Sequence, residues 1–196
     1  MKRALLVLEI LLAVAGVTAL AYLARVWREA RVAQTQGRAE IHRAAASAAP
    51  PAARAPVAEG TVLGEIAIPR IGLSRVILEG TEPDTLRRAV GHIRGTAMPG
   101  QPGNVALAGH RDTYFRPLRN IRIGDEVILR TRSGAEVYRV DSTRIVRPDD
   151  VAVLDNTPSD TLTLVTCYPF RYVGPAPERF IVRAVKTAAP AAEKTS

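Results

Sequence analysis

The chain has 196 residues, 47% of them apolar, which allows one domain of ordinary size and excludes collagen-like and wholly disordered classes. Its one cysteine, Cys167, cannot close an internal disulfide. The formal charge of +8 points to an anionic neighbour. Basic residues are densest beside the first apolar run, and those further on alternate with acids, so we expect a membrane surface as partner and no nucleic acid.

Residues 1–24 are the expected transmembrane anchor. The run over residues 4–24 carries one charge, at Glu9, and as a helix it would span about 31 Å, close to the thickness of a bilayer core. The alternative is a cleaved signal peptide, with Ala19-Leu20-Ala21 as a small-x-small cleavage site. The apolar run favours the anchor, because it is longer than a usual signal core.

The charges that flank this anchor bear on its orientation. Lys2 and Arg3 precede the apolar run, whereas Arg25, Arg28 and Arg31 follow it. Basic flanking residues tend to stay in the cytoplasm. Charge counting alone therefore predicts a cytoplasmic domain.

Residues 25–60 are interpreted as a juxtamembrane helix followed by a linker. Up to about residue 46 the segment is rich in Ala, Arg, Gln and Glu without an apolar stripe, which allows a short solvated helix. Residues 47–58 contain Pro50 and Pro51 and predict an extended, semi-rigid spacer. The tail at 188–196 has too little apolar content to pack, and we expect it to be disordered.

From residue 61 to 187 the pattern predicts an all-β domain. Short runs of alternating or β-branched residues are broken by turn residues roughly every 8 to 12 positions, as in barrels and sandwiches. Helical turns are expected at 83–90 and 115–120. The expected strands cover 64–69, 74–80, 104–109, 125–130, 135–146, 161–166 and 179–185.

Cys167 is a candidate nucleophile, because it ends the most β-prone segment of the chain just before Tyr168. A strand end fixes the backbone, while the loop that follows leaves the side chain reachable. A thiol nucleophile also needs a proton donor and acceptor. His110 follows an apolar strand and suits that role, whereas His92 lies in a Gly-rich stretch that suits a hydrogen-bonded loop residue. A cysteine and a histidine alone are weak evidence for catalysis, so the alternative that Cys167 is an inert buried residue remains.

Three segments resemble the signature regions of sortases, the membrane-anchored cysteine transpeptidases of bacterial surfaces. They are TLVTC at 163–167, NVALAGHRDTYFRPLRNIRIGD at 104–125 and PERFIVRA at 177–184. The resemblance covers roughly residues 61–187, and it is greater to class D than to class A. It implies a closed β-barrel of about eight strands with short helical turns, preceded by one transmembrane helix.

The resemblance also implies the site residues. It places the nucleophile at Cys167, the proton donor and acceptor at His110, and the oxyanion or substrate ligand at Arg179. Thr166 would shape the floor beside the thiol, and the backbone N–H of Thr166 or Tyr168 could donate to the oxyanion.

Alternatives to these roles remain at the level of sequence. Arg171 and Arg183 compete with Arg179 for the place of the essential arginine. Asp112 and Asn104 could orient His110, but no triad partner can be assigned.

The implied reaction cleaves a C-terminal sorting signal of the Leu-Pro-x-Thr-Gly or Leu-Pro-x-Thr-Ala kind through a thioacyl enzyme. The protein is then transferred to an amine of peptidoglycan or of a pilin. This implies a domain on the extracytoplasmic side of the membrane, against the charge count. No metal site and no other cofactor are expected, although a weak calcium site at Asp149, Asp150 and Asp155 stays open.

Three other functions remain as alternatives. One is a membrane-tethered β-barrel that binds a partner without catalysis, and another is a cysteine hydrolase of the same signal. The third is a wall L,D-transpeptidase, but that class has Gly before its cysteine where this chain has Thr166.

Overall fold

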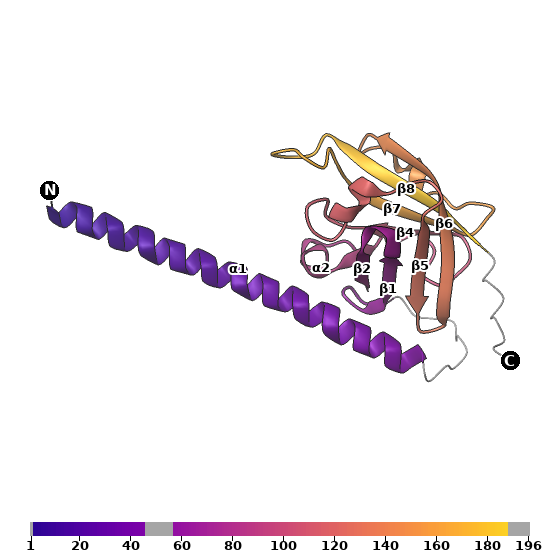
Figure 1. Cartoon of the computed structure of the whole chain (residues 1–196), viewed down its shortest axis with the longest axis horizontal. Helices are drawn as coiled ribbons and strands as arrows, with labels where there is room; N and C mark the ends of the chain where they lie inside the picture. Colours follow the sequence, from indigo (N-terminus) through magenta and orange to yellow (C-terminus); the bar gives the residue numbers. More distant parts are fainter. Residues whose placement is uncertain (1, 46–56, 188–196) are drawn as a thin grey trace.

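The computed structural model describes residues 2–45 and 57–187. It consists of one long helix and one closed β-barrel, with the N-terminal half of the helix extending well beyond the barrel (Figure 1). The expected closed barrel of about eight strands is therefore confirmed. The predicted spacer lies mostly outside the described residues, and the predicted tail lies wholly outside them.

Helix α1 (Lys2–Ala45) contains both the apolar run and the polar segment that follows it. No proline interrupts residues 2–45, so the helix continues past the apolar run for about 30 Å, where a short separate helix was expected. It has one stretch long and apolar enough to cross a membrane, by length and composition. The polar half of α1 lies against β1 and β2 (Figure 1).

The barrel is closed by strands in the order β1-β2-β3-β4-β7-β8-β6-β5. Two neighbouring pairs are parallel, β2 with β3 and β4 with β7, and the others are antiparallel. The strands are β1 (Val62–Ile68), β2 (Leu73–Glu79), β3 (Val90–His92), β4 (Asn104–Ala108), β5 (Glu126–Thr131), β6 (Gly134–Val146), β7 (Thr161–Tyr168) and β8 (Glu178–Lys186).

The barrel interior is filled by branched apolar side chains that alternate along the strands. On β7, for example, Leu162 and Leu164 are fully buried in the core cluster, while Val165 and Cys167 on the other face are only partly buried. Because successive side chains of a strand point to opposite faces, this alternation fixes which residues lie outside the barrel. Cys167 is thus placed on the outer face.

The sequence missed some short elements. The three-residue strand β3 is too short to show an alternating pattern, yet it joins β2 to β4 and so completes the barrel. The one-turn helices η1 (Pro69–Ile71) and η3 (Val151–Leu154) were also missed. The expected helical turns are α2 (Pro83–Arg88) and η2 (Arg116–Asn120). All seven expected strands are present, and their ends agree with the expected ones to within two residues.

Candidate active site

Cys167 lies on β7, one residue before the strand ends, and its free thiol is partly buried. Strand β7 has β4 on one side and β8 on the other. Residues from both neighbours can therefore reach the thiol, and each neighbour supplies one of the residues expected there.

Arg179 is the direct partner of Cys167 across the antiparallel β7–β8 ladder. Side chains of such a pair point to the same face, with their Cα atoms about 4.5–5.5 Å apart. The Arg179 Nη1 atom donates to the carbonyl oxygens of Ala176 (3.2 Å) and Glu178 (2.9 Å). Within residues 57–187 no carboxylate pairs with Arg179, so its positive charge beside the thiol is not neutralised by an ion pair.

His110 follows β4, which runs parallel to β7 with Ala108 opposite Val165. His110 and Cys167 are each two positions beyond this pair, so both lie at the same edge of the barrel. The imidazole is exposed. Among the described residues it makes no hydrogen bond to Cys167 or Arg179, so a proton transfer between them requires a bound substrate or a small movement.

Two hydrogen bonds and one close ring contact fix the backbone at Gly109, just before His110. The Gly109 N–H donates to the Val165 carbonyl (3.2 Å), and the Thr166 hydroxyl donates to the Gly109 carbonyl (2.7 Å). The ring of the buried Phe115 lies where a side chain of Gly109 would be, only 2.8 Å from an ideal Cβ. Residue 109 must be glycine for this ring to approach, and the approach sets the position of His110.

Thr166 and Tyr168 flank the thiol in different ways. Thr166 is only 2% exposed and faces the barrel interior, so its side chain joins the ends of β4 and β7 rather than lining the outer face. The Tyr168 ring stacks on Phe180 and meets Phe170 edge-on, with ring centroids 6.3 and 6.0 Å apart. Tyr168 and Phe180 belong to the strand face opposite Cys167, and Phe170 and Phe180 pack against the barrel core.

Arg111 was missed by the sequence reasoning. Its guanidinium donates to the carbonyl oxygens of Pro169 (2.9 Å), Tyr172 (3.0 Å) and Gly174 (3.4 Å), and it lies 5.7 Å from the centre of the Tyr172 ring. It therefore ties the segment after His110 to the connection between β7 and β8. Its position next to His110 in the sequence was the available signal.

Other candidates are not brought to the site. Asn104 is buried at the opposite end of β4, where its amide donates to the carbonyls of Val153 (3.2 Å) and Asp155 (3.0 Å). It cannot orient His110, and that part of the expectation was wrong. Asp112 is exposed and makes no hydrogen bond within residues 57–187.

The competing arginines also differ from Arg179 in position. Arg171 is exposed in the β7–β8 connection. Arg183 is paired with Thr163, further from the strand ends than Cys167. Arg179 alone of the three lies directly opposite the thiol.

His92 is a structural residue. It is 1% exposed at the end of β3, and its Nδ1 atom lies 2.8 Å from the Glu79 carboxylate. Its Nε2 atom lies 3.0 Å from the Ala97 carbonyl and 3.1 Å from the Thr96 hydroxyl. With both ring nitrogens occupied and no access to solvent, His92 is not available for proton transfer.

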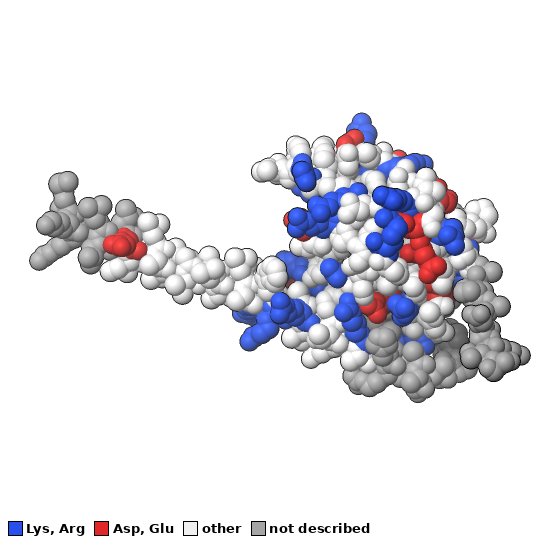
Figure 2. All heavy atoms as spheres, viewed as in Figure 1, with Lys and Arg blue, Asp and Glu red and all other residues white. Residues whose placement is uncertain are grey.

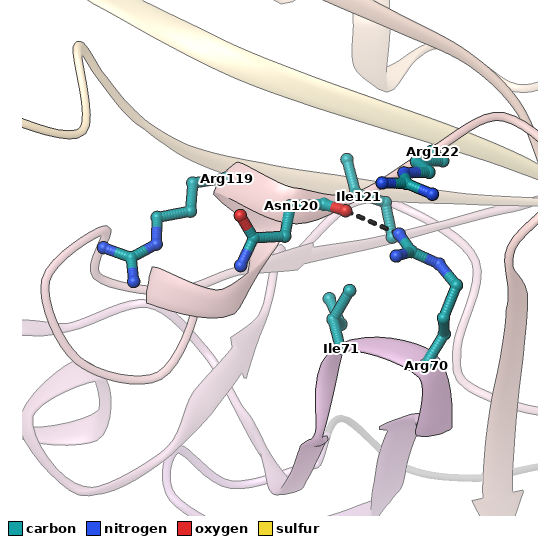
Figure 3. Close-up of a pocket in the computed structure, with 6 residues that line it drawn as sticks. All are labelled: Arg70, Ile71, Arg119, Asn120, Ile121 and Arg122. Atoms are coloured by element: carbon teal, nitrogen blue, oxygen red, sulfur yellow. Dashed lines mark hydrogen bonds between the residues drawn. The ribbon is translucent and has the colours of Figure 1, made fainter.

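A hollow of about 540 Å³ lies between η1 and η2 and contains none of the site residues (Figure 3). Arg70 crosses it and donates to the Asn120 carbonyl (2.5 Å) and to the Asp125 carboxylate (2.6 Å). The hydrogen bond from Arg70 is the main reason that the pKa of Asp125 lies below its ordinary value. Among the described residues there is also no group of three or more His, Cys, Asp or Glu placed to hold a metal ion.

The structure thus places Cys167 opposite Arg179, with His110 following the strand parallel to β7. The family model of the sortase domain matches residues 66–187. The chain belongs to the sortase family. The expected likeness to class D is supported by sortase D from Bacillus subtilis, which is 39% identical over 124 residues.

Other sortases are similar over shorter or more divergent segments. Sortase A from Listeria monocytogenes is 32% identical over 110 residues. The matched segments cover 63% of the Bacillus protein and 49% of the Listeria protein, so this sortase chain spans about half to two thirds of these relatives. The solved structure of a Clostridium perfringens sortase D5 transpeptidase superimposes with a TM-score of 0.68 at 26% identity, over 82% of this chain and 99% of that one.

Proposed function

We propose that this sortase is a membrane-anchored cysteine transpeptidase that joins proteins to an amine acceptor. Its substrates would carry a C-terminal sorting signal of the Leu-Pro-x-Thr-Gly or Leu-Pro-x-Thr-Ala kind. The acceptor would be an amine of peptidoglycan or of a pilin. The observation that carries the proposal is the pairing of Cys167 with Arg179 at the barrel edge that also holds His110.

In the first half-reaction the Cys167 sulfur attacks the carbonyl carbon of the Thr–Gly or Thr–Ala peptide bond. A carbon–sulfur bond forms, and the carbonyl oxygen becomes an oxyanion in the tetrahedral intermediate. The Arg179 guanidinium forms no ion pair within residues 57–187, and its N–H groups other than those on Nη1, which bonds two carbonyls, would donate to that oxygen. The carbon–nitrogen bond then breaks, and His110 gives its proton to the departing amine.

In the second half-reaction the acceptor amine attacks the thioester carbon. His110, now neutral, takes the proton that the amine loses. The carbon–sulfur bond breaks, an amide forms, and Cys167 is regenerated as a thiolate beside a protonated His110. The exposure of His110 suits this role, because both the departing and the incoming amine must reach it.

We place the catalytic domain on the extracytoplasmic side of the cell membrane, held by α1. The apolar part of α1 supports a single membrane span. Sorting signals and wall amines are outside the cytoplasm, which favours this orientation over the one predicted from the arginines that follow the span. Protease added to spheroplasts should degrade the domain. Protection until lysis would contradict the extracytoplasmic placement.

Intact mass spectrometry of the detergent-solubilised chain tests the chemistry. The chain is incubated with Leu-Pro-x-Thr-x peptides, with and without triglycine. We expect a mass increase equal to the acyl fragment on Cys167, which triglycine discharges as a ligated peptide. Cys167→Ala should lose the adduct while keeping its melting temperature. Release of free acid despite added triglycine would indicate a hydrolase, and no adduct on a thiol that still alkylates would indicate a binding module.

A further inference from the structure

The junction between α1 and the barrel lies close to the expected membrane surface. The apolar run ends at Ala24, and α1 reaches α2 at Val26 and Glu29, which line a hollow of about 190 Å³ together with residues of α2. At 1.5 Å of rise per residue these positions are roughly 3–8 Å beyond the run. The headgroup layer on each side of a bilayer core is about 5–7 Å thick. Helix α2 is therefore at headgroup depth when the run spans the membrane.

Basic side chains gather at this junction, and Figure 2 shows Lys and Arg clustered where α1 reaches the barrel. The α1 members follow the apolar run, and the α2 members lie in its last turn. Acidic residues are fewer here, and two of them pair locally, Glu29 with Arg25 (2.9 Å) and Asp84 with Arg87. The basic residues are Arg25, Arg28, Arg31, Arg87 and Arg88, and the acidic ones are Glu29, Glu82 and Asp84. The junction keeps a net positive charge.

Aromatic side chains mark the same level. Tyr22 and Trp27 are 64% and 66% exposed on either side of Ala24. Amphipathic rings at the end of an apolar helix are typical of the membrane interface. They support a boundary of the bilayer at the start of the basic cluster.

The barrel is docked on α1 by specific contacts. The Gln34 side chain accepts from the Val76 N–H (2.9 Å) and donates to the Arg88 carbonyl (3.1 Å). Gly37 is buried, and an ideal Cβ there would be 2.8 Å from a methyl group of Val76. Arg38 forms an ion pair with the buried Glu65 (3.2 Å). These contacts fix how the barrel is turned about the helix.

The same end of the barrel carries the active site. The Tyr114 hydroxyl, in the turn after His110, donates to the Arg87 carbonyl of α2 (2.9 Å). The connection between β7 and β8 extends toward the side on which the N-terminal half of α1 lies (Figure 1). Contact of α2 with lipid would therefore turn the Cys167 edge toward the membrane.

We propose that the α2 end of the barrel rests on anionic lipid headgroups through Arg87 and Arg88, so that the active site opens toward the membrane surface. This rests on the membrane span of the proposed function. Each basic residue held near an anionic surface contributes about 1 kcal/mol. The lipid phosphate is the matching partner, because guanidinium groups bind phosphate through paired hydrogen bonds.

Hydrogen exchange of the full chain in nanodiscs tests the orientation. Amides of residues 83–88 are compared in phosphatidylcholine alone and in phosphatidylcholine mixed with phosphatidylglycerol. We expect exchange slower on the order of tenfold in the anionic discs. Arg87→Glu with Arg88→Glu should remove the difference. The matched control, Arg139→Glu with Arg144→Glu on the exposed face of β6, should keep it.

A second variant separates docking from charge. Gly37→Leu forces α1 away from Val76 while leaving both α2 arginines in place, and it should also abolish the lipid-dependent protection. Equal exchange in the two lipids would overturn the proposed surface, provided that the chain resists carbonate extraction. Release of the chain by carbonate would instead contradict the membrane span itself.

Discussion

Cys167 and Arg179 are cross-strand partners on the outer face of the barrel, one on β7 and one on β8. The ladder between two strands holds this pair more rigidly than loop positions would, because hydrogen bonds along both strands fix the backbone. The Cα atoms of the two residues therefore keep their spacing without a bound substrate. The proposed role of Arg179 as an oxyanion donor benefits from this fixed backbone, because such a donor acts best when it needs little reorganisation.

Arg179→Ala should lower kcat by about 10²- to 10³-fold, because removal of one oxyanion donor typically costs that much. Arg179→Lys should retain more of kcat than Arg179→Ala but less than the wild type, since an ammonium group lacks the forked donor geometry. Arg183→Ala is the matched control, because it lies on the same face of β8 but opposite Thr163. Steady-state kinetics with a sorting-signal peptide measures both. A loss as large in Arg183→Ala would remove the special role of position 179.

Arg111→Ala should free the β7–β8 connection and lower turnover by at least about tenfold, because small displacements of a site reduce rates strongly. The variant loses hydrogen bonds to three carbonyls, at Pro169, Tyr172 and Gly174. Hydrogen exchange should rise over residues 169–174 and stay constant in β1. Reduced activity without faster exchange there would rule out a positioning role for Arg111.

Gly109→Ala should lower the free energy of unfolding by about 1–3 kcal/mol, because its methyl group overlaps the ring of Phe115. The turn that begins at His110 must then shift, so turnover should fall as well. Combining it with Phe115→Leu makes room for the methyl group. The double variant should be less destabilised than the sum of the single ones, and strict additivity in denaturant unfolding would contradict the contact.

Asp125→Asn should destabilise the barrel by about 1–2 kcal/mol at neutral pH, a value reduced by the partial exposure of Arg70. The pKa of Asp125 is lowered in the folded chain, mainly by the hydrogen bond from Arg70. The ionised Asp125 therefore contributes fully to the free energy of unfolding above its ordinary pKa of 3.8. This contribution is lost as the pH falls through the lower pKa of the folded chain.

Urea unfolding of both proteins at several pH values measures this effect. The difference in free energy of unfolding between the wild type and Asp125→Asn should become smaller only below about pH 4. A gap that is constant down to the acid transition would mean that the loss comes from packing and not from the charge.

Much of this fold was predictable from local patterns. The alternation of apolar with polar or β-branched residues in 161–166 and 135–146 located β7 and β6, because the side chains of a strand point to its two faces in turn. Strand β3 was not predictable, since Val90, Gly91 and His92 form a strand only through pairing with β2 and β4. Pairing partners far apart in the sequence leave no local signal.

The candidate site was also predictable only in part. The sequence located Cys167 and His110 at strand ends, and the family resemblance located Arg179. The register that puts Arg179 opposite Cys167 is a property of the closed barrel and could not be counted from spacing. The wrong expectation for Asn104 has the same origin, because only the direction of β4 shows that it lies at the far end from His110.

The unbroken helix α1, docked to the barrel through Gln34, Gly37 and Arg38, has a consequence for how substrates are found. A domain on a loose tether samples a volume, whereas a domain fixed to its own membrane span moves with that span. With the apolar run in a bilayer, Cys167 stays at one height and travels in two dimensions. Encounter rates then depend on lateral diffusion in the membrane, and substrates held in that membrane meet the enzyme more often than substrates free in solution.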